Sequence, residues 1–189
     1  ERQRYTVNAV PDFLRAHFPP QRDELIHVVI NHQAQQDLSR RTGLSSIVIP
    51  NVMNFDVHSQ PDRQRCAQFR AAVGVADNEV LMLQPTRVVA RKGIEHSIEL
   101  AKALSDRKCK LVVTHSNDDE GLQYFRHLNR LAGYMGVDLF FAGDLVGSDT
   151  EHHNGKPSSL ADSYPACELV TSTSPSESFG NALLEAVFY

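Results

Sequence analysis

From residue 80 to residue 189, short apolar runs that are typical of β-strands alternate with stretches of helical periodicity. The expected strands and helices are Val80–Gln84, Ile94–Leu104, Lys110–Thr114, Glu120–Gly133, Asp138–Ala142, Ser159–Tyr164, Leu169–Ser172 and Gly180–Tyr189. Strands that alternate with helices pair in parallel, because each helix is a crossover that returns the chain to the same end of the sheet. The pattern therefore predicts an α/β domain with a doubly wound, Rossmann-like parallel sheet and helices on both faces.

The first part of the chain repeats this pattern on a smaller scale. A strand is expected over Leu25–Ile30, a helix over His32–Arg41 and a second strand over Ile47–Ile49. Polar turns without periodicity follow, and a further helix is expected over Asp62–Val73. We therefore predict the end of an N-terminal, Rossmann-like domain in residues 1–50, a linker in 51–61 and a C-terminal domain in 62–189. Glu1 is not an initiator Met and no stop signal follows the last helix, so we expect further sequence on both sides.

Composition and charge exclude several classes of protein. A hydrophobic content of 41% over 189 residues is enough for a globular core. The 19 basic and 23 acidic residues give a net charge of −4, so no basic excess suits nucleic acid. The apolar runs fall far short of the roughly 18 residues that a membrane span needs. Three widely spaced cysteines lack the spacing of a zinc site or a disulfide framework, which favours a reducing cytoplasm.

The loop after the strand Val80–Gln84 carries three cations, Arg87, Arg91 and Lys92. Ligands of parallel sheets bind outside the carboxyl ends of the strands, which is where this loop is expected. An arginine offers a planar fork of donors, and a lysine offers a flexible point charge. Arg87 and Lys92 are therefore candidates for holding a diphosphate, whereas Arg91 is interpreted as a solvated loop cation.

Residues 174–186 leave the strand Leu169–Ser172, turn through small residues and enter a helix at about Gly180. The free amides at such a helix start can receive an anion. Glu177 precedes the helix, and Glu185 lies inside it on the same face as Asn181, off the apolar arc of Leu183, Leu184 and Val187. Eight residues at helical rise separate the two carboxylates by roughly 12 Å, which is too wide for an acid/base pair on one glycosidic bond. The spacing suits two carboxylates at opposite ends of a long ligand.

Five motifs point to a family, because they occur along the chain in the family's order and spacing. The pair Glu177/Glu185, the tripeptide Phe179-Gly180-Asn181, the residues Arg87/Lys92-Gly93, the tripeptide Ile49-Pro50-Asn51 and the segment 164–169 together resemble glycosyltransferase family 4. Members of this family are retaining, nucleotide-sugar-dependent transferases of the GT-B fold, in which two Rossmann-like domains face each other across a cleft. The resemblance covers about Leu25–Tyr189, as the tail of the acceptor domain and most of the donor domain.

The resemblance implies a role for each of these residues. Arg87 and Lys92 would hold the donor diphosphate and stabilise the leaving group, and Glu177 would bind sugar hydroxyls, so these three are the catalytic candidates. The amides of Phe179, Gly180 and Asn181 would meet sugar or phosphate, and Glu185 would bind the ribose. Two positions depart from the family pattern: Val52 replaces a Gly, and Thr173 replaces a Pro. Neither is expected to touch a donor-binding position.

The predicted function is transfer of a hexose from a nucleoside-diphosphate sugar to an acceptor hydroxyl with retention of configuration. The acceptor, a sugar, a lipid-linked group or a small molecule, is not identified, and this chain alone is expected to be inactive. No cofactor is expected, because this transfer needs no covalent enzyme cofactor. No metal is expected either, because an Asp-x-Asp motif is absent. Two other clusters receive simpler interpretations, Asp118–Glu120 as helix-capping residues and Asp149–His153 as a polar loop.

Other readings of the motifs stay open. The chain could be part of a GT-B sugar phosphorylase or nucleotide-sugar epimerase, or a non-catalytic module that binds nucleotide sugars. We expect a cytoplasmic protein, or one peripheral to a membrane through its N-terminal domain.

Overall fold

A computed structural model describes residues 17–53, 62–115, 122–147, 158–177 and 179–189. The chain divides into two compact units, residues 1–53 and residues 54–189. None of the helices in the described ranges is long and apolar enough to cross a membrane. The assignment of the two units to an acceptor domain and a donor domain stays a prediction.

The first unit is a small β-α-β arrangement. Strands β1 (Val28–Val29) and β2 (Ile47–Val48) pair in parallel, and helix α2 (His32–Thr42) connects them. Asn31 begins α2, because its side-chain oxygen accepts a hydrogen bond from the Ala34 amide at 2.7 Å. The strands are shorter than the sequence pattern predicts, but their positions and the intervening helix agree with it.

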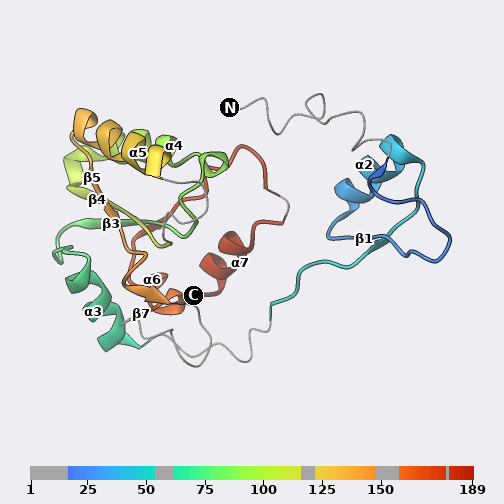
Figure 1. The fold of residues 1–189 in the computed structure, drawn as a ribbon. Coiled ribbons are helices and arrows are strands. Elements are labelled where there is room, and N and C mark those ends of the chain that lie inside the picture. Colours follow the sequence, from blue (N-terminus) through green and yellow to red (C-terminus); the bar gives the residue numbers. More distant parts are fainter. Residues whose placement is uncertain (1–16, 54–61, 116–121, 148–157, 178) are drawn as a thin grey trace. The chain divides into compact units, whose positions relative to one another are not determined.

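The second unit is built on a parallel sheet of four strands in the order β5-β4-β3-β8 (Figure 1). These strands are β3 (Val80–Gln84), β4 (Cys109–Val113), β5 (Asp138–Phe141) and β8 (Leu169–Val170). Gln84 pairs with Val113, and Leu83 pairs with Val170 on the other side of β3. Because β3 is central, the loop that follows it lies beside the loop that follows β8.

Helices cover both faces of this sheet. Helices α4 (Ile94–Ala103) and α5 (Leu122–Met135) lie on one face, and α3 (Arg63–Ala72), α6 (Leu160–Ser163) and α7 (Asn181–Phe188) lie on the other (Figure 1). Successive strand residues point to opposite faces, so Met82 belongs to the core beneath α4 and α5, while Leu81 and Leu83 belong to the core on the α3 side. The predicted α/β architecture is therefore confirmed.

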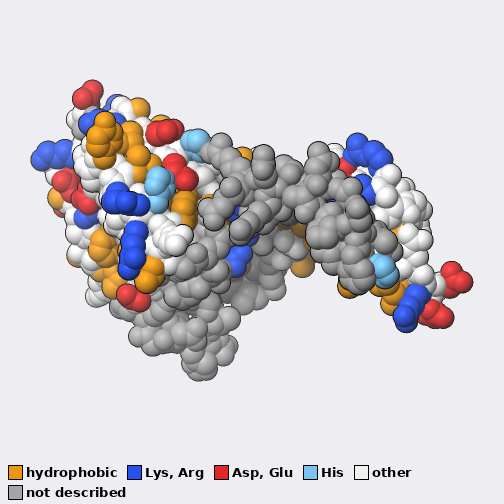
Figure 2. All heavy atoms as spheres, turned by 45° about the horizontal axis from the view of Figure 1, so that its top comes forward, with side chains coloured by type: hydrophobic (Ala, Val, Ile, Leu, Met, Phe, Trp, Pro, Cys, Tyr) orange, Lys and Arg blue, Asp and Glu red, His pale blue; other side chains and the backbone are white. Residues whose placement is uncertain are grey.

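The face of the second unit over α4 and α5 is chemically mixed. In the view of Figure 2, basic, acidic and hydrophobic side chains are interspersed among the described residues over α4 and α5. Helix α7 contacts the core through Ala186 and Tyr189, whereas Leu183, Leu184 and Val187 remain exposed. The apolar arc that the sequence suggests on α7 is thus not the face that contacts the core.

Several short elements lie outside the sequence prediction. These are the 3₁₀ turns η3 (Ala90–Lys92) and η4 (Ser105–Arg107) and the strands β6 (Val146–Gly147) and β7 (Ser158–Ser159), which pair with each other in parallel. The expected helix over Glu120–Gly133 appears as α5, and its predicted start at Glu120 falls outside the described residues. Two- and three-residue elements carry too little periodicity to be recognised in a sequence.

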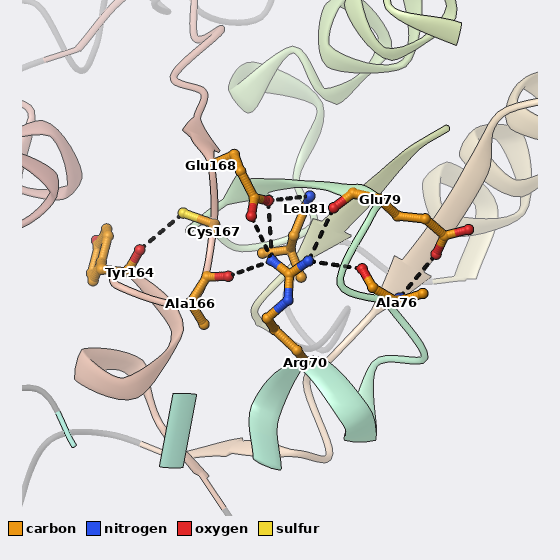
Figure 3. Close-up of polar contacts among 8 residues, drawn as sticks. All are labelled: Arg70, Ala76, Glu79, Leu81, Tyr164, Ala166, Cys167 and Glu168. Atoms are coloured by element: carbon orange, nitrogen blue, oxygen red, sulfur yellow. Dashed lines mark hydrogen bonds and ion pairs between the residues drawn. The ribbon is translucent and has the colours of Figure 1, made fainter. Parts of the chain in front are cut away.

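A half-buried arginine, Arg70, ties α3 to β3 and β8 at the edge of the sheet opposite the strands' carboxyl ends (Figure 3). The Arg70 guanidinium donates to the carbonyl oxygens of Ala166, Ala76 and Glu79 at 2.9–3.0 Å. It also forms a forked contact with the Glu168 carboxylate at 2.9 and 3.1 Å. Glu168 in turn accepts a hydrogen bond from the Leu81 amide at 2.7 Å. These contacts hold the starts of β3 and β8 together.

Candidate functional site

The candidate site lies at the carboxyl end of the sheet, where the loop after β3 meets the segment after β8. The pairing of Leu83 with Val170 brings residues 85–93 close to residues 171–177. Lys92 and Glu177 are 85 positions apart in the sequence, yet their side chains are hydrogen bonded. The topology of the sheet is therefore what brings these two predicted residues together.

Gly93 determines the course of the chain just after Lys92. Its φ of +60° lies in the left-handed region, and it begins helix α4. A Cβ atom at this position would come within 2.6 Å of the Thr173 carbonyl oxygen, which is backbone and cannot move away cheaply. A glycine is thus required here both by conformation and by space. The close approach fixes the Lys92 turn against the segment that leads to Glu177.

Lys92 and Glu177 form an ion pair in which both side chains are largely covered, with 18% and 28% of their surfaces exposed. Burial raises the pKa of the Glu177 carboxyl, but hydrogen bonds from Lys92 and Ser174 and the positive charge of Lys92 outweigh burial. The pKa of Glu177 therefore lies below its ordinary value of 4.5, and the group is an anion at neutral pH. A carboxylate of this kind accepts hydrogen bonds from hydroxyl groups.

A largely buried polar network connects the Lys92 turn to the ends of β3 and β8. The Thr173 hydroxyl lies 2.8 Å from the Gly93 carbonyl oxygen and 3.2 Å from that of Lys92. The Gln84 amide donates to Thr173 Oγ1 at 3.0 Å and to the Lys92 carbonyl oxygen at 3.2 Å. Ser97 of α4 and Thr171 complete the network, with their hydroxyl oxygens 3.1 Å apart.

This network corrects one expectation from the sequence. Thr173 was expected not to touch a donor-binding position, but its hydroxyl contacts the backbone of Lys92. A proline at residue 173 has no hydroxyl and could not make these bonds. The signal in the sequence was a polar side chain at the end of each of two apolar strands, Gln84 as the last residue of β3 and Thr171 directly after β8. A polar residue buried at a strand end needs partners, and here those partners are the loop carbonyls.

The start of α7 contributes backbone rather than side chains. Gly180 has a φ of +81° and precedes the helix, and it offers no side-chain cap to the first amides. Phe179 and Gly180 are half-buried, while Asn181 is exposed. A helix start that lacks a capping side chain directs amides and a partial positive field toward solvent. The structure thus places these three predicted residues at a helix N-terminus.

Glu185 is held by a contact from the core. It lies on the second turn of α7, half-buried, and its carboxylate accepts a hydrogen bond from the Tyr164 hydroxyl. Tyr164 is only 4% exposed and stacks on Tyr189 with ring centroids 5.6 Å apart. The sequence placed Tyr164 in a family motif but gave no reason to connect it with Glu185.

Arg87 is exposed on the same loop as Lys92. Among the described residues, no three His, Cys, Asp or Glu side chains form a group that could hold a metal ion. The acidic cluster Asp118–Glu120 and the polar loop Asp149–His153 fall outside the described ranges. The structure thus joins Lys92 to Glu177 directly and fixes Glu185 through Tyr164.

The chain is similar to two curated relatives. It is 30% identical over 200 residues to the mannosylglucosylglycerate synthase of Petrotoga mobilis, and 31% identical over 193 residues to the protein of the same name in Thermotoga maritima. These alignments cover 97% and 93% of this chain but only 46% and 43% of the relatives. The chain therefore spans about half the length of the curated relatives it matches. No family model matches the chain.

A solved structure shares the fold. The Anabaena protein HepE, crystallised with UDP-glucose, superimposes with a TM-score of 0.66 at 18% identity, over 86% of this chain and 42% of HepE. At this level of identity the likeness concerns the fold alone. The relatives of the chain are glycosyltransferases, and its second unit has the parallel α/β architecture found in GT-B glycosyltransferases.

Proposed function

We propose that the chain is the donor-binding part of a retaining hexosyltransferase that uses a nucleoside-diphosphate sugar. The observation that carries this proposal is the Lys92–Glu177 pair at the carboxyl end of the sheet, next to a helix start without a side-chain cap. A cation, a carboxylate and helix amides suit a ligand that carries both phosphate and hydroxyl groups. The names of the curated relatives support transfer of a sugar, and the HepE complex supports a nucleotide-sugar donor.

Lys92 is proposed to bind the diphosphate while it keeps its hydrogen bond to Glu177. An ammonium group has three N–H donors, so one can remain on the carboxylate while two reach phosphate oxygens. Arg87 on the same loop would add a second cation, and the amides of Phe179, Gly180 and Asn181 would add neutral donors. This arrangement would stabilise the charge that develops on the departing nucleoside diphosphate, which is where electrostatic catalysis acts.

The two carboxylates are proposed to bind opposite ends of the donor. Glu177, ionised and next to Lys92, would accept hydrogen bonds from sugar hydroxyls close to the diphosphate. Glu185, on the second turn of α7, would accept hydrogen bonds from the ribose. The acceptor would be aligned on the same face of the sugar as the leaving group, because a single displacement that retains the configuration requires attack on that face.

Calorimetric titration of variants tests these assignments. Glu185→Ala should weaken a bare nucleoside diphosphate and the matching nucleotide sugar by similar factors, because both contain ribose. Glu177→Ala should leave the diphosphate nearly unchanged and weaken only the nucleotide sugar. If Glu177→Ala reduces diphosphate affinity as strongly as Glu185→Ala does, the assignment of the carboxylates to opposite ends is wrong.

Activity of the full-length protein tests the class of reaction. We expect transfer from a nucleotide sugar to an acceptor, and no turnover by the 189-residue chain alone. Release of a sugar phosphate in the presence of inorganic phosphate would indicate a phosphorylase, and an altered nucleotide sugar would indicate an epimerase. Binding of a nucleotide sugar by a full-length protein that neither hydrolyses nor transfers it would indicate a non-catalytic module.

A further inference from the structure

Tyr164 is a constrained side chain that contacts Glu185, one of the candidate site residues. It follows α6, a single turn whose start is closed by reciprocal hydrogen bonds between Ser159 and Asp162 at 3.0 and 3.1 Å. The Tyr164 ring belongs to the core on the α3 side of the sheet and stacks on Tyr189 with an interplanar angle of 12°. Packing therefore fixes both torsions of this side chain.

The rigid Tyr164 ring places its hydroxyl against the flexible side chain of Glu185. Tyr164 Oη donates to Oε2 of Glu185, and no other described residue donates a hydrogen bond to this carboxylate. An unconstrained glutamate samples many rotamers, and ordering it costs conformational free energy. The hydrogen bond from Tyr164 orders Glu185 in the folded chain before a ligand binds, and it leaves Oε1 of Glu185 available as an acceptor.

We propose that Tyr164 is a positioning residue that orients Glu185 toward the ribose hydroxyls and so makes the site selective for ribonucleotides. This inference rests on the proposed function, because it takes Glu185 as the ribose ligand. An ionised carboxylate only accepts hydrogen bonds, and ribose offers two vicinal hydroxyl donors. A deoxygenated sugar has no donor to give, so the benefit of a pre-oriented Glu185 is lost with it.

The test compares ligands that differ only in those hydroxyls. UDP, GDP and ADP are titrated against the full chain by calorimetry, and the tightest is then compared with its 2′,3′-dideoxy analogue. Tyr164→Phe should weaken the ribonucleotide about fivefold, the value of one typical hydrogen bond, and should change the affinity for the dideoxy analogue less than twofold. Glu185→Gln should likewise weaken binding of the ribonucleotide and leave binding of the dideoxy analogue nearly unchanged.

A second tyrosine offers a matched control. Tyr124 of α5 donates to Glu95 of α4 at 2.8 Å, which is the same pair of groups on the opposite face of the sheet. Tyr124→Phe should alter the urea midpoint about as much as Tyr164→Phe does, with no change in either affinity. In the double variant with Glu185→Ala, Tyr164→Phe should cost no further affinity, since the residue acts through Glu185.

The outcomes separate this inference from the proposed function. If the wild-type chain binds none of the three diphosphates, the proposed function fails. If it binds them but holds the dideoxy analogue equally well, Glu185 is not the ribose ligand, and the proposed function fails at that residue. If the wild type prefers the ribonucleotide but Tyr164→Phe weakens both ligands alike, the positioning role is wrong. If Tyr164→Phe does not fold, the Glu185→Gln comparison decides in the same way, because unchanged ribose selectivity in that variant contradicts the inference.

Discussion

The Arg70 tie provides the sharpest test of what holds the second unit together. Arg70 is 14% exposed in its side chain and contacts two separate segments of the chain, the turn over residues 76–79 before β3 and residues 166–168 before β8. Replacing it with alanine removes the hydrogen bonds to three carbonyl oxygens and the forked contact to Glu168. The substitution therefore removes the side-chain contacts between α3 and the starts of β3 and β8, and it leaves the residues of the candidate site unchanged.

The size of the effect follows from how exposed each contact is. The Glu168 side chain is 50% exposed, so its ion pair with Arg70 contributes only about 0.5–1 kcal/mol. Hydrogen bonds from a charged donor are worth about 1.5–3 kcal/mol each when buried, but water replaces part of this at carbonyls near the surface. We expect Arg70→Ala to reduce the free energy of unfolding by about 3 kcal/mol, which lowers Tm by about 6–12 °C.

Arg65 is the matched control, because it lies on the same helix and has the same chemistry. Its side chain is 52% exposed and its nearest carboxylate, Asp62, is 3.9 Å away. Arg65→Ala therefore makes the same change in charge and in helix propensity, and it should cost less than about 0.5 kcal/mol. Urea unfolding of both variants of the full chain measures the difference. Equal losses for the two variants would refute the argument that Arg70 ties α3 to the two segments before β3 and β8.

Four further results are expected. Gly93→Ala should destabilise the chain by more than about 1 kcal/mol and weaken binding of nucleoside diphosphates, because its Cβ would come within 2.6 Å of the Thr173 carbonyl oxygen, and urea unfolding together with titration measures both. The folded pKa of Glu177 lies below 4.5, so its stabilising contribution is fully present above pH 4.5 and is lost as the pH falls through the folded value. The stability difference between wild type and Glu177→Gln should therefore shrink in urea titrations below that pH, and a constant difference would contradict it. Burial raises the pKa of Cys167 to about 12, so this thiol should react slowly with a thiol reagent at neutral pH and rapidly in denaturant. Transfer by the full-length protein should persist in excess chelator, whereas complete loss and rescue by a divalent cation would show that a metal is needed.

The local sequence determined most of the secondary structure. The strand Val80–Gln84 appears with the bounds that its apolar run predicts, and α4 and α7 differ from their predicted bounds by about one residue at an end. Apolar periodicity and glycines at helix ends act over a few residues, so they can be recognised without knowing what packs against them. The parallel pairing of the strands followed from the alternation of strands and helices, whereas the order of the strands did not.

Only the tertiary structure decided which distant residues meet. Lys92 contacts Glu177 because β3 pairs with β8, and neither side chain signals the other in the sequence. The Tyr164–Glu185 bond and the Thr173 network arise in the same way, from helix and strand packing across the core. Contacts of this kind depend on the relative placement of whole elements. Local propensities do not encode that placement, because burial of apolar surface on both faces of the sheet sets it.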